Sequence, residues 1–276
     1  MNNGKIVFIG GGNMARSLIG GLVADGLSAD NIHVLDTQKA VLQTLKQTFA
    51  VQVHEDLASA VASADVIVLA VKPQQMQDGV KSLATVWPAN ALLISIAAGI
   101  RLADLGRWLQ KDAAIVRAMP NTPSLVQAGA TALFANNHVS EQQREQAEAI
   151  LRAVGLALWL DNETKMDAVT ALSGSGPAYF FLVMEAMENA AIELGLPQET
   201  ARLLCLETAF GAAKMALESD VPAATLRQQV TSPGGTTERA IHELEDGGLH
   251  GLFENALVAA ALRARELGDQ LGQDHD

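Results

Sequence analysis

The chain has little cysteine, little positive charge and no long hydrophobic run. Cys205 is the only cysteine among 276 residues, which excludes an intrachain disulfide and fits a reducing compartment. It stands in the apolar helical pattern "RLLCLETAF". We therefore interpret Cys205 as a small core residue, with a reactive thiol as the alternative.

Basic residues are outnumbered by acidic ones. The 19 lysines and arginines face 31 aspartates and glutamates, so the formal net charge is −12. Phosphate backbones and anionic lipid surfaces require basic faces. The charge balance therefore predicts no nucleic-acid partner and no membrane partner. Any negatively charged ligand must be held locally, by helix ends and backbone N–H groups.

The sequence also shows no pattern typical of a membrane span, an export signal or a metal site. The apolar runs "DVIVLAV" and "ALLISIAAGI" are shorter than the roughly 20 residues that span a bilayer. The segment "MNNGKIVFIGGG" lacks the pattern of a signal peptide, so we expect a cytoplasmic protein. The six histidines show no ligand spacing with cysteine or carboxylates, and we predict no metal site.

What the first half does contain is a regular alternation of short apolar runs and amphipathic segments. Such alternation indicates crossover connections and a parallel sheet covered on both faces. We predict helices at 13–26 and 39–49. The predicted strands are 5–10, 31–36, 51–55, 65–71, 91–98, 115–120 and 129–135.

From about Asp161 the pattern becomes helical, with long segments at 177–195, 199–219 and 251–271. The first of these is apolar on nearly all sides, which requires burial against several neighbours. We therefore predict a dinucleotide-binding domain at 1–161 and an all-helical domain at 162–276. The helical domain has more apolar surface than it can hide alone, which favours an intertwined dimer over a monomeric bundle.

The motif "IGGGNMA" directly follows a predicted strand and opens a predicted helix. In this context Gly10 permits the tight turn, Gly12 lets a pyrophosphate approach the backbone, and Ala15 keeps the helix close to the sheet. The motif predicts dinucleotide binding. A plain glycine turn is the alternative.

Asp36 ends the second predicted strand. A carboxylate there accepts hydrogen bonds from adenosine ribose hydroxyls and repels a 2′-phosphate, which favours NAD(H). Lys39 can partly offset the repulsion, and Asp36 can instead cap the next helix. The choice between NAD(H) and NADP(H) therefore stays open.

Three further loops follow predicted strands, where ligands collect in open α/β sheets. They are "LAVKPQ" at 69–74, "SIAAGI" at 95–100 and "AMPNTP" at 118–123. Small residues leave room for a flat ring, and two prolines stiffen the third loop. Each loop alone is compatible with a structural turn. Together they indicate a bound nicotinamide nucleotide.

Two glycine loops open helices in the second domain, "LSGSGPAYFF" at 172–181 and "TSPGGTTE" at 231–238. His242 is the one histidine near them and lies a full turn into a helix, so covalent catalysis with a Ser-His-Asp set is not supported. Both loops instead offer backbone N–H and hydroxyl donors at helix N-termini. Such donors hold a small carboxylate.

With these motifs in this order, the chain resembles the pyrroline-5-carboxylate reductase family over essentially its whole length. The motifs are "IGGGNMA", "AVKPQ", "SIAAGI", "MPNTP", "LSGSGPAY" and "TSPGGTTERAIHELE". The resemblance implies a Rossmann-type domain that binds NAD(P)H and a helical domain that forms an intertwined dimer, commonly assembled into decamers. It implies reduction of the C=N bond of 1-pyrroline-5-carboxylate to L-proline.

The resemblance also implies site residues. Thr237 would donate to the ring nitrogen or help deliver its proton, and Glu163 would lie near the imino acid. The cofactor set implied is Gly10, Gly12, Asn13, Met14, Ala70, Val71, Lys72, Pro73, Ala97, Ala98 and Gly99. The substrate carboxylate and nitrogen would be held by Ser232, Gly234, Gly235, Thr236 and Thr237.

Two positions depart from the family pattern. Leu57 stands where relatives often have an asparagine, and Asp36 stands where many relatives have a small hydroxyl residue. Both departures concern the contacts to the adenosine half of the cofactor.

Two other functions compete with reduction of the imino acid. A β-hydroxyacid dehydrogenase shares the two-domain plan but requires a lysine base, and neither Lys165 nor Lys214 lies in such a motif. A non-catalytic NAD(P)H sensor would not require the substrate-side loops.

Overall fold

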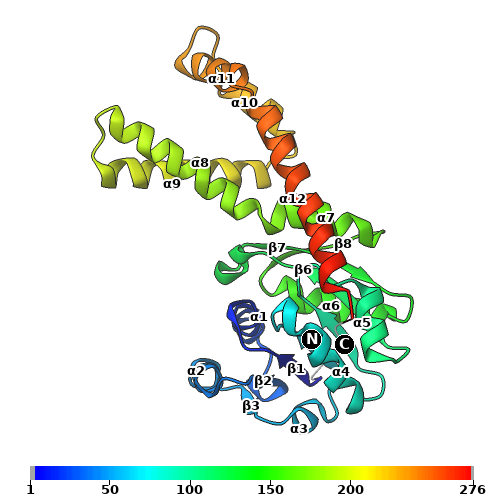
Figure 1. Cartoon of the computed structure of the whole chain (residues 1–276). Coiled ribbons are helices and arrows are strands. Elements are labelled where there is room, and N and C mark those ends of the chain that lie inside the picture. The colour runs from blue at the N-terminus through cyan, green and yellow to red at the C-terminus, as the bar shows by residue number, and fades with distance from the viewer. Residues whose placement is uncertain (1–3, 275–276) are drawn as a thin grey trace. The chain divides into compact units, whose positions relative to one another are not determined.

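A computed structural model of the chain describes residues 4–274, and it divides into two compact units (Figure 1). The first unit holds the residues up to Ser175 and those from Ala259 onward, and the second is Gly176–Val258. This division falls later in the chain than the predicted boundary between 161 and 162. It also returns the C-terminal end of the chain to the first unit.

The first unit is built on one eight-stranded sheet with the order β3-β2-β1-β4-β5-β6-β7-β8. β1 lies in the interior and β2 and β4 pair with it in parallel, as in dinucleotide-binding folds. All seven predicted strands are present. The strands are β1 (Ile6–Ile9), β2 (Ile32–Leu35), β3 (Gln52–His54), β4 (Val66–Leu69), β5 (Leu92–Ser95), β6 (Ala114–Met119), β7 (Gly129–Ala135) and β8 (Gly155–Trp159).

The expectation of a wholly parallel sheet is wrong at one pair. β7 runs antiparallel to β6, with Met119 opposite Ala132. Their connection, residues 120–128, contains only the 3₁₀ turn η3 (Thr122–Val126). A parallel crossover needs a dozen or more residues, usually with a helix. The short connection therefore returns the chain antiparallel.

β8 was not predicted. It pairs parallel to β7 at the edge of the sheet. Its side chains alternate, with Leu156 and Leu158 exposed and Ala157 and Trp159 packed against the core. The alternation over five residues is the signal that could have identified this strand.

Two apolar layers cover the sheet, one on each face. On one face β1 residues such as Phe8 pack with α1, α2 and α6. On the other face Val7 packs with α3, α4, α5 and the end of α12. The helices are α1 (Asn13–Ala24), α2 (Lys39–Phe49), α3 (Leu57–Val61), α4 (Met76–Thr85), α5 (Leu102–Leu109), α6 (Glu141–Arg152), α7 (Met166–Val169) and α12 (Leu249–Leu271).

The second unit is all helical, as predicted. It contains α8 (Gly176–Glu193), α9 (Gln198–Leu217), α10 (Ala223–Gln229), α11 (Thr236–Asp246) and the first part of α12. α8 packs against α9, and Cys205 is buried with its thiol near the Met184 carbonyl. None of the helices in the described chain combines the length and hydropathy of a membrane span.

Candidate active site

The β1–α1 loop requires glycine for two different reasons. Gly10 has φ +100°, and a Cβ there would lie 2.6 Å from the Ala70 carbonyl oxygen. Gly12 is the N-cap of α1, and a Cβ there would meet no atom within 4 Å. Gly10 is thus fixed by the close approach of β4, whereas Gly12 faces open space beside the start of a helix.

The N-terminus of α1 is open to a ligand. No side chain caps it, and within the described chain the N–H groups of Asn13, Met14 and Ala15 have no acceptor. Ala15 is fully buried, which lets α1 pack close to the sheet. Unsatisfied N–H groups at a helix N-terminus bind phosphate. A hollow of about 300 Å³ adjoins this helix start, lined by Gly11, Gly12, Asn13, Arg16, Ala40, Val41, Thr44 and Leu45.

Asp36 stands at the carboxyl end of β2 and supports the same loop. One carboxylate oxygen accepts from the Gly11 N–H at 2.8 Å, and the other accepts from the Gln38 N–H at 2.8 Å. Lys39 pairs with Glu55 at 3.2 Å. Asp36 therefore joins the glycine loop to the start of α2 and retains lone pairs for a further donor.

The β4–α4 loop begins beside Gly10. The Ala70 N–H continues the strand pairing by donating to the Ile9 carbonyl at 2.8 Å. Val71 packs partly on the core, and Pro73 opens the 3₁₀ turn η2 (Pro73–Gln75). Lys72 is exposed, and its ammonium makes no ion pair within residues 4–274. The loop thus presents a free cation at the carboxyl edge of the sheet.

The β5–α5 loop presents only part of its predicted contact surface. Ala98 is exposed, whereas Ala97 and Gly99 are buried. Gly99 has φ +79°, and a Cβ there would lie 3.2 Å from Leu271 and 3.5 Å from the Gly268 nitrogen of α12. Gly99 is therefore required for packing against the C-terminal helix, and Ala98 is the residue free to meet a ligand.

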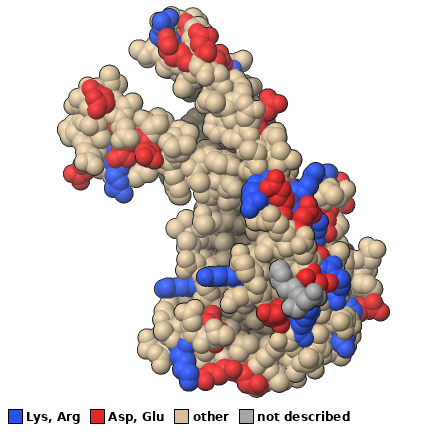
Figure 2. All heavy atoms as spheres, viewed as in Figure 1, with Lys and Arg blue, Asp and Glu red and all other residues tan. Residues whose placement is uncertain are grey.

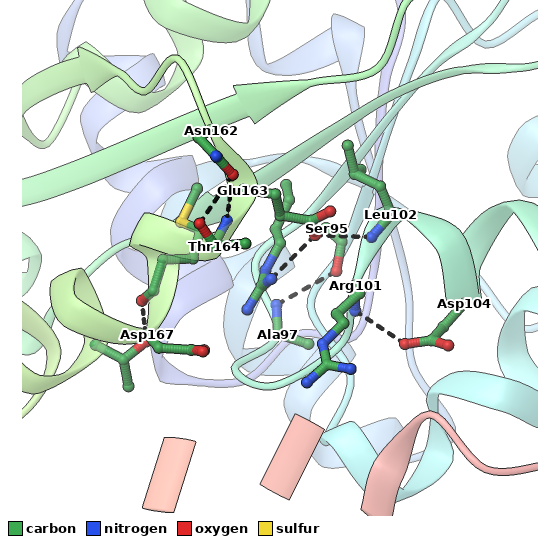
Figure 3. Close-up of polar contacts among 12 residues, drawn as sticks. Ser95, Ala97, Arg101, Leu102, Asp104, Asn162, Glu163, Thr164 and Asp167 are labelled. Atoms are coloured by element: carbon green, nitrogen blue, oxygen red, sulfur yellow. Dashed lines mark hydrogen bonds and ion pairs between the residues drawn. The ribbon is translucent and has the colours of Figure 1, made fainter. Parts of the chain in front are cut away.

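Glu163 lies behind this loop, at the start of the 3₁₀ turn η4 (Glu163–Lys165). One oxygen of its carboxylate accepts from the backbone N–H of Leu102 at 2.9 Å (Figure 3). The same oxygen accepts from Arg117 at 3.0 Å. Arg117 is only 4% exposed and was not predicted as a site residue. A cation inside the apolar strand "IVRAM" requires a buried carboxylate partner, and that pattern is the signal that could have identified it.

Asn121 is a second residue that the sequence analysis did not single out. Its amide donates to the Ser173 carbonyl at 3.0 Å and accepts from the Ala130 N–H at 2.9 Å. Asn121 thereby joins the "MPNTP" loop to the "LSGSG" segment and to β7. The structure brings these two motifs together, although they lie far apart in the sequence.

The remaining predicted residues form the α10–α11 loop of the helical unit. Gly234 has φ +71°, and its N–H donates to the Glu238 carboxylate at 2.7 Å. The Gly235 N–H donates to the Ser232 carbonyl at 3.0 Å. The N–H groups of Thr236 and Thr237 have no acceptor in the described chain. The Glu238 N–H likewise has no acceptor there, so the open donors of this helix start are those of Thr236, Thr237 and Glu238, not those of the glycines.

Two family models match the chain. Residues 163–267 match the model described as pyrroline-5-carboxylate reductase dimerisation, and residues 5–99 match NADP oxidoreductase coenzyme F420-dependent. The pyrroline-5-carboxylate reductase of Pseudomonas aeruginosa is 53% identical over 99% of this chain and 100% of its own length. That of Vibrio alginolyticus is 42% identical over 97% of this chain and 98% of its own.

Solved structures agree in fold. A pyrroline-5-carboxylate reductase from Coxiella burnetii has a TM-score of 0.93 at 49% identity, covering 96% of this chain and 99% of that one. The Plasmodium falciparum pyrroline carboxylate reductase with NADP bound has a TM-score of 0.86 at 29% identity, covering 97% and 99%.

Proposed function

Because the chain belongs to the pyrroline-5-carboxylate reductase family, we propose that its glycine loops hold a nicotinamide nucleotide and a cyclic imino acid for hydride transfer. The protein reduces the C=N bond of 1-pyrroline-5-carboxylate to L-proline with NAD(P)H, the last step of proline biosynthesis. The dehydrogenase and sensor alternatives are not favoured, since whole-length relatives are reductases. The observation that carries the site proposal is the pair of helix starts, α1 and α11, with open N–H groups.

The nucleotide end is proposed from the first unit. Gly10 and Gly12 shape the loop, and the open N–H groups of Asn13 and Met14 hold the pyrophosphate. Asp36 meets the adenosine ribose. On the nicotinamide side the contacts are those of Ala70, Val71, Lys72, Pro73, Ala97, Ala98 and Gly99, with Ala98 the most accessible of the last three. NAD(P)H supplies the hydride when bound.

The substrate end is proposed from the α10–α11 loop. The N–H groups of Thr236 and Thr237 hold the carboxylate, and the Ser232 hydroxyl lies in the same exposed loop. Gly234 and Gly235 give the loop its shape, because their own N–H groups are bonded within it. The Thr237 hydroxyl donates a hydrogen bond that orients the ring nitrogen, or it helps to deliver the proton of that nitrogen. Since a protonated imine is already electrophilic, orientation is most of what the protein must supply.

Assembly, domain limits and location complete the proposal. We retain the boundary between 161 and 162 as a functional one, and the match of the dimerisation model to 163–267 supports it. Self-association through this region takes the form of an intertwined homodimer, with assembly into a decamer as the further step. The protein acts in the cytoplasm, without nucleic-acid or membrane partners.

The decisive experiment is an assay of the purified protein with 1-pyrroline-5-carboxylate and each reduced nucleotide, combined with Thr237→Ala. A lost hydrogen bond to a charged group costs about 1.5–3 kcal/mol, so kcat/KM for the imine is expected to fall by about one to two decades. Affinity for the nucleotide stays unchanged, since it binds the first unit.

Gly235→Val is expected to damage imine reduction as well, but a Cβ there lies 3.0 Å from the Ser232 carbonyl oxygen, so its melting temperature must be measured alongside. Thr200→Ala is the matched control, a threonine in the first turn of α9 with an exposed side chain. Normal imine kinetics in a folded Thr237→Ala protein would show that this loop is only a turn.

A further inference from the structure

We propose that Glu163 is a positioning residue for hydride transfer, which holds the start of α5 through Leu102 and is itself fixed by Arg117. The inference rests on the proposed function, because that function assigns the loop to the nicotinamide ring. This role differs from the contact with the imino acid that the family resemblance implied for Glu163.

The first observation is where the Glu163 carboxylate is bonded. Oε1 accepts from the backbone N–H of Leu102 at 2.9 Å, and Leu102 is the first residue of α5. The first N–H groups of a helix have no acceptor within the helix. Glu163 therefore closes the N-terminus of α5 from outside. Asp104 assists from inside the helix by accepting from the Arg101 N–H at 3.3 Å.

The second observation is the charge behind that bond. The same Glu163 oxygen accepts from Arg117 Nη1 at 3.0 Å, and the exposed side-chain fractions are 5% for Arg117 and 23% for Glu163. Within the described residues Arg117 makes no other ion pair. A buried guanidinium that loses its carboxylate is left with an uncompensated charge. The pair is therefore held together strongly, and it fixes Glu163 in the place where it meets Leu102 (Figure 3).

The third observation is that β5 and α12 also hold the loop. Ser95, at the end of β5, is fully buried, and its hydroxyl accepts from the Ala97 N–H at 3.4 Å. On the opposite side, a Cβ at Gly268 of α12 would lie 3.1 Å from the Gly99 carbonyl oxygen. The loop 96–101 is thus closed by β5, by α12 and by Glu163. Only Ala98 is left exposed between these supports.

These observations predict which binding step depends on Glu163. Both bonds of Glu163 go to Oε1, which accepts from Leu102 and from Arg117 and so ties the carboxylate to the start of α5. A displaced Leu102 would shift the loop, and with it the surface under the nicotinamide ring. Since a misplacement of about 1 Å can cost a large factor in rate, loss of Glu163 should affect nicotinamide binding and hydride transfer together.

The test uses the full-length protein and two nucleotides, the reduced cofactor and the corresponding ADP-ribose that lacks the nicotinamide ring. Glu163→Ala is expected to weaken reduced-cofactor binding about tenfold, while ADP-ribose binding stays at the wild-type value. The primary isotope effect with 4-deuterated cofactor should rise as hydride transfer becomes slower. Glu163→Gln, which keeps an acceptor for Leu102 but not the charge, should fall between wild type and Glu163→Ala.

Glu148→Gln is the matched control. Glu148 also accepts from an arginine and from an N–H donor, Arg152 at 3.1 Å and Trp159 Nε1 at 2.9 Å, but it lies on α6 and is not bonded to this loop. Its nucleotide binding and isotope effect should match wild type. If Glu163→Ala folds poorly, the Glu163→Ala/Arg117→Met double variant removes the unpaired charge. It should recover the melting temperature without recovering reduced-cofactor affinity.

Two results would overturn the proposal. One is unchanged reduced-cofactor affinity with a raised imine KM, which would return Glu163 to substrate binding. The other is an equal loss for the reduced cofactor and for ADP-ribose, which would show a general structural defect. Both binding measurements need no imine, so they remain decisive even if the proposed imine reduction were not observed.

Discussion

At the scale of single residues, Asp36 bears on the choice between NAD(H) and NADP(H). Its two oxygens bond to the N–H groups of Gly11 and Gln38, so it supports the glycine loop, and we propose that it also meets the adenosine ribose. A carboxylate in this place favours a free 2′-hydroxyl and repels a 2′-phosphate. We therefore predict that the enzyme uses NADH at a substantial rate, whatever its rate with NADPH.

Asp36→Ser should shift the ratio of kcat/KM values toward NADPH by about tenfold, which corresponds to about 1.4 kcal/mol. The serine keeps at most one of the two backbone bonds, so a small drop in melting temperature is also expected. Asp30→Ser is the control, because Asp30 lies in the turn that precedes β2, and its carboxylate accepts from the Gln52 side chain. Strong rejection of NADH by the native enzyme would contradict the placement of Asp36 at the ribose.

The Glu238 side chain determines which N–H groups of the motif "TSPGGTTE" remain available to a ligand. The glycines of "TSPGGTTE" were expected to offer their N–H groups to an anion, but the Gly234 N–H is bonded to Glu238. Within the described residues, the N–H groups that stay open at this helix start belong to Thr236, Thr237 and Glu238. The glycines are still required, since Gly234 has φ +71°. Their contribution is the path of the backbone.

At the scale of elements, the edge pair β2–β3 contains two histidines in contact. His33 Nδ1 and His54 Nε2 lie 2.8 Å apart. Burial lowers the pKa of His33 to about 4, with further lowering by Lys5 and His54 and a smaller opposing effect from the Asp30 backbone. Burial and Lys5 also lower the pKa of His54, against the raising effect of Asp56.

The direction of the pH effect follows from these shifts. The ordinary pKa is 6.5, so between pH 6.5 and about 4 the unfolded chain binds more protons than the folded one. The stability associated with the neutral pair is fully present above pH 6.5 and is lost as the pH falls toward 4. We predict a melting temperature that drops over this interval.

Thermal unfolding at several pH values, compared between wild type and a variant without the two histidines, separates their contribution from that of the many carboxylates that also titrate. The His33→Gln/His54→Gln variant should lose less melting temperature than wild type between pH 7 and pH 4.5, because it no longer has imidazoles that gain a proton on unfolding. An identical loss in the two proteins would show that this pair does not contribute.

The last turns of α12 and the residues that follow them pack against α5 of the first unit. Asp274 accepts from the Trp108 indole N–H at 2.8 Å and pairs with Arg107 at 3.3 Å, and the Trp108 bond lowers the pKa of its carboxyl group. Arg101 pairs with Asp269 at 2.7 Å. These contacts attach the C-terminal end to α5, directly beyond the loop proposed to face the nicotinamide ring.

At the scale of the whole molecule, the helical unit exposes more apolar surface than an isolated soluble protein tolerates. Phe180, Phe181 and Leu182 of α8 are 68%, 63% and 65% exposed, and Phe210 of α9 is 65% exposed. Figure 2 shows a broad uncharged area over this unit. Together with the dimerisation model matched by 163–267, this surface indicates burial against a second copy.

We predict an obligate dimer at low micromolar concentration, measured by sedimentation. Phe180→Glu should weaken the association, because a charge would be buried against the partner. Val126→Glu is the control, a residue of η3 in the first unit that is 75% exposed. A folded, active monomer of the native protein at that concentration would contradict this prediction.

The sequence by itself determined the features that depend on neighbouring residues. Apolar periodicity identified seven strands and the long helices, because side-chain burial repeats over a few residues. The glycine requirement at Gly10 was also readable, since a strand–turn–helix motif fixes the backbone locally. The family resemblance then gave the chemistry, which the whole-length relatives confirm.

Only the tertiary structure decided the features that join distant parts of the chain. The Glu163–Arg117 pair and the contact of Asp274 with Trp108 each link segments with no shared local pattern. Glu163 and Arg117 are 46 positions apart, and Trp108 and Asp274 are 166 apart. Local sequence preferences carry no information on which of these distant side chains will be in contact. That choice is made when the layers pack, where an unpaired charge is too costly to bury.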